Sequence, residues 1–162
     1  MVCAASSDAW NREYATFQAI PSSVRETPSK AVLLLANLIQ LPPHFNVLDL
    51  GCGNGRNSLF FAELGGEVHA VDFSSAAASE THQRVLRANV SDRVHVYHQS
   101  FSDALPLSSG SFDIVLDAYV LCHFLEPADQ RAYVNLARAM VRDSGRILEP
   151  MPSQVETMMG FL

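Results

Sequence analysis

The stretch that decides the fold reads Val47-Leu48-Asp49-Leu50-Gly51-Cys52-Gly53-Asn54-Gly55-Arg56-Asn57. A short apolar run leads into glycines at alternate positions, and an amphipathic run follows them. A second apolar run then ends in an acid, Val68-His69-Ala70-Val71-Asp72. This order of strand, glycine loop, helix, strand and carboxylate is typical of one half of a nucleotide-binding α/β fold.

The spacing of the glycines indicates the kind of nucleotide. The dinucleotide fingerprint, Gly-x-Gly-x-x-Gly, places a pyrophosphate over a helix N-terminus. Here the pattern is Gly-x-Gly-x-Gly, and Asp49 precedes it at the end of the strand. A carboxylate there repels a pyrophosphate but suits a ligand with a positive end. S-adenosylmethionine has that character, and Asp72 can accept two hydrogen bonds from its ribose diol.

At this point the chain resembles a known family. The segment Asp49 to Gly55 is similar to motif I of the class I S-adenosylmethionine-dependent methyltransferases, and Asp72 is similar to their ribose-binding acid. The resemblance implies a Rossmann-like, doubly wound α/β fold whose mostly parallel sheet carries helices on both faces. It covers about residues 45–150 closely and about residues 10–44 loosely. The residues that it assigns to the donor in this region are Asp49, Gly51, Cys52, Gly53, Asn54, Asn57 and Asp72.

Further candidate residues follow the expected strands, where ligands bind in open α/β sheets. Phe73 would lie on the adenine face, with packing in the core as the alternative. The resemblance implies polar contacts to adenine from Ser102 and Asp103. It also places Asp117 near the methionine part of the donor and in catalysis; the alternative is a helix N-cap. Arg56 would pair with the donor's carboxylate or point to solvent.

Methyl transfer from a sulfonium needs the protein chiefly to position the reactants, and a general base only for a protonated oxygen or nitrogen acceptor. His123 follows the fourth strand and is the best-placed base; the alternative is packing on the sheet edge. Cys122 beside it is expected to be a small buried residue. We expect no metal site, because ligand spacing is lacking around the other histidines, which are His44, His69, His82, His95 and His98.

The N-terminal region carries Trp10, Tyr14 and Phe17 at helical spacing. This predicts an amphipathic helix over about residues 1–20, which either packs on the domain or forms a lid. It resembles the N-terminal segment of small methyltransferases of the thiopurine and tellurite-resistance type. We therefore divide the chain into an N-terminal helical segment or lid, residues 1–44, and an S-adenosylmethionine-binding α/β domain, residues 45–162.

The alternation of strands and helices predicts a mostly parallel sheet with right-handed crossovers. After the fifth strand only residues 151–162 remain, too few for the helix and the C-terminal antiparallel strand pair usual in the resembled family. We therefore expect that pair to be missing. We also expect the uncovered edge and the apolar tail to fold back or, in preference, to form a homodimer contact. The expected strands are 47–50, 67–71, 93–98, 112–116 and 146–149. The expected helices are 28–41, which starts at Pro28-Ser29, 55–64, 74–88, which Ser74 caps, and 127–145.

The composition limits the class of protein further. A length of 162 residues fits one domain, and no apolar run is long enough to cross a bilayer. The first residues do not resemble a signal peptide, and three cysteines are too few for a disulfide framework or zinc site, which favours the cytoplasm. The net charge of −6 disfavours nucleic acid as a partner.

The sequence therefore predicts an S-adenosylmethionine-dependent methyltransferase that acts on a small-molecule acceptor. One alternative is a methyltransferase-fold partner subunit that binds the donor but is catalytically incomplete. A second alternative, a nicotinamide-dependent oxidoreductase, is disfavoured by the glycine spacing and by Asp49.

Overall fold

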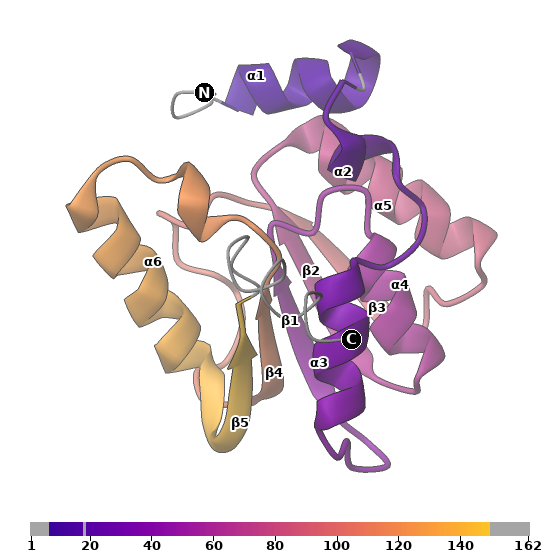
Figure 1. Cartoon of the computed structure of the whole chain (residues 1–162), viewed down its shortest axis with the longest axis vertical. Helices are drawn as coiled ribbons and strands as arrows, with labels where there is room; N and C mark the ends of the chain where they lie inside the picture. The colour runs from indigo at the N-terminus through magenta and orange to yellow at the C-terminus, as the bar shows by residue number, and fades with distance from the viewer. Residues whose placement is uncertain (1–6, 18, 150–162) are drawn as a thin grey trace, which may run out of the picture.

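The computed structural model describes residues 7–17 and 19–149. Their strands form one sheet in the order β3-β2-β1-β4-β5, and every neighbouring pair is parallel (Figure 1). The predicted Rossmann-like, doubly wound α/β fold is confirmed, and no antiparallel strand pair is present in this part of the chain. The strands are β1 (Asn46–Leu50), β2 (Glu67–Asp72), β3 (Val94–His98), β4 (Phe112–Asp117) and β5 (Val141–Leu148).

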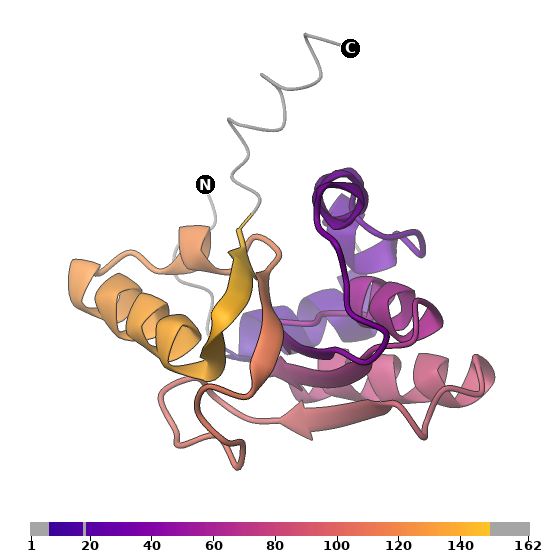
Figure 2. The same cartoon turned by 90° about the horizontal axis from the view of Figure 1, so that it is seen from below.

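Helices cover both faces of the sheet. Figure 2 shows α3, α4 and α5 on one side of the sheet and α6 on the other. The helices are α1 (Ser7–Arg12), η1 (Glu13–Phe17), α2 (Pro21–Val24), α3 (Lys30–Leu38), α4 (Arg56–Glu63), α5 (Ser75–Arg87), η2 (Leu121–His123) and α6 (Pro127–Met140).

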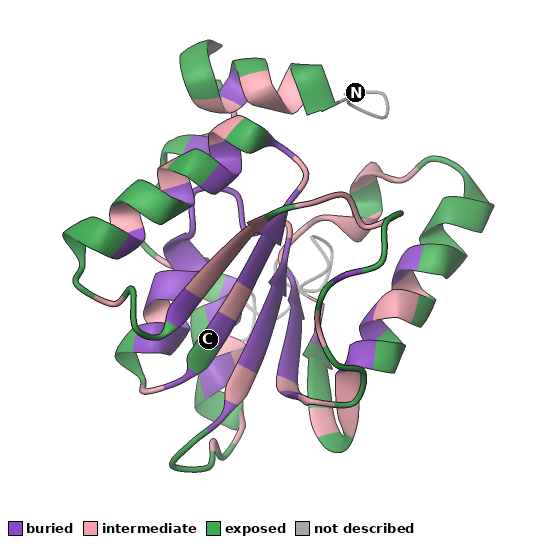
Figure 3. Ribbon diagram, turned by 180° about the vertical axis from the view of Figure 1, so that it is seen from behind, coloured by how far each residue is buried: buried purple, intermediate pink, exposed green. Residues whose placement is uncertain are grey.

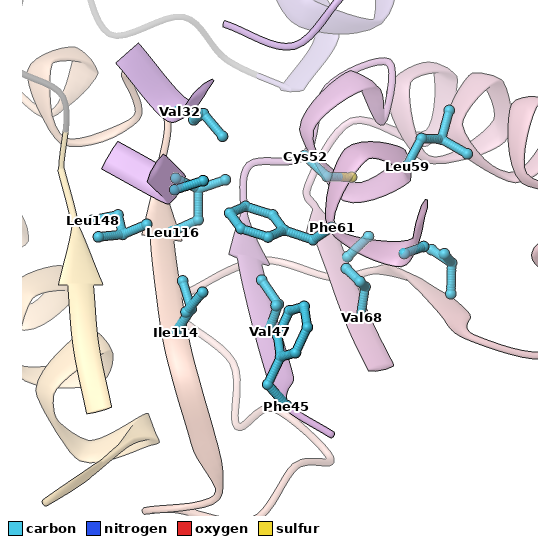
Figure 4. Packing of buried hydrophobic residues seen from close by; sticks show 14 of the residues in the cluster. Val32, Phe45, Val47, Cys52, Leu59, Phe61, Val68, Ile114, Leu116 and Leu148 are labelled. Atoms are coloured by element: carbon cyan, nitrogen blue, oxygen red, sulfur yellow. The ribbon is translucent and has the colours of Figure 1, made fainter. Parts of the chain in front are cut away.

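Alternate side chains of the buried strands pack into two separate hydrophobic cores, because successive side chains of a strand point to opposite faces of the sheet. The core under α3, α4 and α5 gathers around Phe61 with Val47 and Ile114 (Figure 4). The core under α6 contains Leu48 and Val115. Figure 3 shows the resulting concentration of buried residues in the strands.

The boundary between α6 and β5 differs from the prediction. The helix was expected to continue to Gly145, but it ends at Met140 and β5 begins at once with Val141. Val141 pairs with Phe112, whereas Arg146 pairs with Ile114, so the residues between them form a bulge. A Cβ on Gly145 would lie 2.8 Å from the backbone oxygen of Phe112, so only glycine fits the bulge.

The N-terminal segment is broken into α1, η1 and α2 rather than one helix. Figure 1 shows α1 lying across the end of the sheet at which the strands finish. No helix of the described residues is long and apolar enough to cross a membrane. The apolar tail at residues 151–162, on which the predicted homodimer contact partly depends, lies outside the described residues.

Candidate functional site

A cleft of about 530 Å³ opens at the carboxyl ends of the central strands. The glycine loop forms its floor, the N-terminal segment its roof, and the β4–α6 connection its far wall. The lining residues that the sequence analysis assigned to a ligand or to catalysis are Gly51, Cys52, Gly53, Asn54, Arg56, Asn57, Asp72, Phe73, Ser102 and His123.

The floor of the cleft depends on a residue without a side chain. Gly53 has a φ of +58°, and a Cβ there would collide with the hydroxyl of Tyr14. The loop is tied to β2, because the backbone N–H groups of Gly51 and Cys52 donate to Val71 O at 2.8 and 3.1 Å. The missing side chain therefore lets Tyr14 of the N-terminal segment approach the loop backbone closely.

Asp72 is fixed in the cleft wall by its own backbone neighbours. Its Oδ2 accepts a hydrogen bond from Gly53 N at 2.9 Å, and its Oδ1 accepts one from Ser74 N at 2.8 Å. Burial raises the pKa of this carboxyl, and the two backbone hydrogen bonds oppose the rise. A carboxylate has about four acceptor sites. Asp72 therefore keeps acceptor capacity for a diol, as the ribose assignment requires.

Asn54 and Asn57 line the cleft, but their amides hold the N-terminal segment. Asn54 Nδ2 donates to the backbone oxygens of Ser23 and Arg25 at 3.1 and 2.9 Å. Asn57 Oδ1 accepts from Ser29 N at 3.0 Å. The structure thus gives both residues a positioning role that spacing alone did not reveal, and their contact with a cofactor stays a prediction.

Arg56 places a buried cation at the cleft. Its side chain is 7% exposed and lines the cleft, yet its Nη1 makes no hydrogen bond within the described part of the chain. Burial lowers its pKa, as does the neighbouring Arg25. A buried donor without a partner is unfavourable, and an anion would relieve it. The carboxylate of S-adenosylmethionine fits this position chemically.

The roof docks on the start of α5. Asn11 Oδ1 accepts a hydrogen bond from the Ser74 hydroxyl at 2.8 Å and from Ala76 N at 3.2 Å. Trp10 and Tyr14, one and three residues away, line the cleft. The N-terminal aromatic residues therefore lie over the glycine loop, which is the arrangement that a lid requires.

The far wall of the cleft is aromatic. The His123 ring meets the Trp10 ring edge-on at 5.1 Å, and Tyr133 packs against Phe101 and Phe124 at 5.3 and 5.1 Å between ring centroids. Burial lowers the pKa of His123, which keeps the imidazole neutral and able to accept a proton. This wall combines aromatic surface with the imidazole of His123, and Glu126 and Asp129 also line the cleft.

Asp49 lies beneath the cleft rather than in its wall. Its side chain is fully buried and points to α4, where Oδ2 accepts a hydrogen bond from the Ser58 hydroxyl at 2.5 Å. Burial raises its pKa to about 7. This position makes Asp49 a support for the glycine loop, since it is absent from the residues that line the cleft.

Asp117 and Asp103 are also absent from the cleft lining. Asp117 accepts hydrogen bonds from the N–H groups of Val120 and Leu121 at 2.6 and 3.1 Å, so it holds the turn before η2, whose N-cap residue is Val120. Burial raises its pKa to about 6. Asp103 is exposed and faces a shallow depression beside Phe73. A contact of either carboxylate with the ligand stays a prediction.

Two further differences concern the residues around His123. The prediction that Cys122 is buried is wrong, because its side chain is exposed and its Sγ donates to Tyr119 O at 3.1 Å. Sequence reasoning missed Tyr119, which lines the cleft with a φ of +76° and has no signature in the sequence. Tyr133 of α6, which the sequence analysis did not assign to the site, is 4% exposed and also lines the cleft.

Comparison with known proteins identifies the family. The family model described as "Methyltransferase domain" matches residues 47–145. The 27-O-demethylrifamycin SV methyltransferase of Amycolatopsis mediterranei is 27% identical over 91% of this chain and 53% of its own length. The ubiquinone biosynthesis O-methyltransferase of Cereibacter sphaeroides is 31% identical over 63% of this chain and 39% of its own length. The chain thus spans about half or less of these curated relatives.

Solved structures show the same fold. The 1,6-didemethyltoxoflavin-N1-methyltransferase of Burkholderia thailandensis, solved with 1,6-didemethyltoxoflavin and S-adenosylhomocysteine, superposes with a TM-score of 0.69 at 25% identity, covering 87% of this chain and 58% of that one. An S-adenosylmethionine-dependent methyltransferase from Geobacter sulfurreducens, in complex with S-adenosylhomocysteine, has a TM-score of 0.64 at 19% identity, covering 91% and 55%. The chain therefore belongs to the methyltransferase domain family, within the class I methyltransferases whose cofactor is S-adenosylmethionine.

Proposed function

We propose that this protein transfers the methyl group of S-adenosylmethionine to a small molecule with a flat, apolar body. The observation that carries the proposal is a single cleft with two unlike sides. One side has the glycine loop, Asp72 and the unpaired Arg56; the other has the aromatic wall and His123. A donor and an acceptor can be held there next to each other, which is the main requirement of an in-line methyl transfer.

The donor side would hold the cofactor through a few named groups. Asp72 would accept the ribose hydroxyls, Phe73 and Ser102 would lie beside adenine, and Arg56 would pair with the carboxylate. S-adenosylmethionine brings an electrophilic methyl carbon, so no residue has to activate it. The chain's task on this side is to orient the cofactor and exclude water.

The acceptor side would select flat molecules and remove a proton. Phe101, Phe124 and Tyr133 offer faces and edges for aromatic contact. Because burial lowers the pKa of His123 and favours the neutral imidazole, one of its ring nitrogens would take the proton of an acceptor hydroxyl or amine. Support also comes from the relatives, whose names specify oxygen or nitrogen methylation.

The test measures S-adenosylhomocysteine formation by the purified chain with a panel of phenols, catechols and aromatic nitrogen heterocycles. We expect turnover with at least one class and a fall in kcat of about 10²–10⁴-fold in His123→Ala, with unchanged cofactor affinity. His82→Ala, an exposed histidine on α5, is the matched control. If His123→Ala turns over as fast as the unchanged protein, His123 is not the general base. Cofactor binding without turnover on any acceptor would favour the donor-binding partner subunit instead.

A further inference from the structure

We propose a second, separate site: a divalent transition-metal site, best suited to Zn²⁺, formed by Glu67, His69 and His95. It lies toward the start of β2 and β3, whereas the cleft lies at their carboxyl ends. Sequence spacing gave no sign of it, because the three residues meet only through strand pairing. The cluster takes no part in the proposed methyl transfer.

Strand geometry puts the three side chains on one face. Glu67 and His69 are two residues apart on β2 and therefore project to the same side. The parallel register pairs His69 with His95 of β3. His95 Nε2 lies 2.6 Å from Glu67 Oε1, and the two imidazole rings are 5.0 Å apart. One ligand atom from each residue lies within 4.8 Å of the others.

These separations suit a bound ion after small side-chain rotations. Zinc binds imidazole nitrogen and carboxylate oxygen at about 2.0–2.2 Å, so ligand atoms in a tetrahedral site lie roughly 3–4 Å apart. Two imidazoles and a carboxylate are a donor set that suits zinc. Three protein ligands also leave one position for water.

The neighbours of His69 orient its imidazole ring as a metal ligand requires. Its Nδ1 lies 3.0 Å from the Tyr97 hydroxyl, which leaves Nε2 to bind an ion. Such a hydrogen bond to the second nitrogen is usual for metal-bound histidine. The ring also meets Phe112 edge-on at 5.4 Å.

The cluster is accessible to an ion from solution, and a bound ion would stabilise this edge of the sheet. The side chains of His95 and Glu67 are 39% and 46% exposed, so the cluster is open to solvent. β3 is an edge strand of the sheet. On this face α6 packs against β4 and β5, away from β2 and β3 (Figure 2). An ion held by both β2 and β3 would fasten the edge strand to the sheet, where edges otherwise need protection.

The test titrates the chelator-treated full chain with Zn²⁺ against a chromogenic competitor. We expect one ion per chain, a higher melting temperature with Zn²⁺, and a tetrahedral visible spectrum with Co²⁺. His69→Ala, His95→Ala and the conservative Glu67→Gln should each weaken binding at least about 10-fold, and Tyr97→Phe about 10-fold. Two exposed residues elsewhere supply matched controls, His82→Ala and Cys122→Ser, which should bind as the unchanged protein does.

Two results would overturn the proposal. The first is no saturable Zn²⁺ binding, which would leave Glu67 and His95 as a surface ion pair of small energetic value. The second is Zn²⁺ binding that stays equal in the unchanged protein and in Glu67→Gln and His95→Ala, because the ion would then be held elsewhere. Circular dichroism checks that each variant folds, and Glu67→Gln replaces an exposed side chain, so the test does not depend on the half-buried His69.

Discussion

At the residue scale, the two buried carboxylates near the glycine loop, Asp49 and Asp72, differ in where their side chains lie. Asp72 lines the cleft and was identified by its spacing from the glycine loop. Asp49 was identified by the same motif, but its strand position turns it toward Ser58 and away from the cleft. The sequence could predict that both acids matter to this loop. It could not predict which one lines the cleft, because that depends on which core each face of β1 covers.

The first prediction concerns Asp49 and pH. Burial raises the pKa of Asp49 from 3.8 to about 7, so the folded state binds a proton more tightly than the unfolded state. Its contribution to stability is therefore full below about pH 4 and is lost as pH rises through about 7. Asp49→Asn, which cannot ionise, should flatten this dependence by up to a few kcal/mol, at roughly 1.4 kcal/mol per pKa unit.

Urea unfolding at about pH 5 and about pH 8 measures the effect. Asp92→Asn, whose side chain is 74% exposed, is the control and should follow the unchanged protein. If Asp49→Asn loses as much stability between the two pH values as the unchanged protein does, Asp49 is not the titrating group.

At the element scale, the N-terminal segment lies over the cleft and is held there by hydrogen bonds. Glu13, 7% exposed, accepts hydrogen bonds from Ile20 N at 2.7 Å and from the Ser23 hydroxyl at 2.6 Å. Asn54 of the glycine loop then holds the backbone of Ser23. The segment is therefore tied both to itself and to the loop that it covers.

The second prediction is that Asn11→Ala loosens this roof. The change removes the acceptor for the Ser74 hydroxyl and Ala76 N, while the Ser74 cap of α5 remains. Affinity for S-adenosylhomocysteine should fall about 5–10-fold, equivalent to roughly one hydrogen bond, with little change in melting temperature. Arg12→Ala, an exposed neighbour, is the control. Deletion of residues 1–20 should lower this affinity further. If the affinity is unchanged after the deletion, the segment only packs on the domain and does not act as a lid.

The helix boundaries show what the sequence pattern could predict and what it could not. Ser74 and Ser29 were predicted at helix starts, and both side chains cap their helices by accepting from Ala77 N and Val32 N. The end of α6 was misplaced because Val141 continues the apolar helical spacing. Pairing with Phe112 of β4 competes with helix propensity there, and a propensity pattern contains no information about that partner.

At the scale of the whole molecule, the sheet has β3 at one edge and β5 at the other. The order of strands and helices along the chain was enough to predict this parallel sheet. Contacts across strands were not predictable from spacing, and the Glu67, His69 and His95 cluster is the clearest case. Such contacts depend on register, which is settled only when the faces of the sheet are packed.

The third prediction is that the chain forms the homodimer expected from the sequence. An uncovered edge strand favours pairing with a second chain, and β5 is such an edge within the described residues. Light scattering at micromolar concentration should give the mass of a dimer, and removal of residues 153–162 should shift it toward the monomer. A chain that is monomeric and equally stable with and without those residues would contradict the dimer.

Calorimetric titration of the chain with S-adenosylhomocysteine and S-adenosylmethionine is the decisive experiment for a methyl-donor site. We expect one molecule of either ligand to bind in the cleft. We further expect a loss of at least about 100-fold in Asp72→Ala, since two charge-assisted hydrogen bonds of roughly 1.5–3 kcal/mol each would be removed. Asp92→Ala, an exposed acid outside the cleft, should bind normally. Unchanged affinity in Asp72→Ala, or no binding of either ligand to the unchanged chain, would contradict the account.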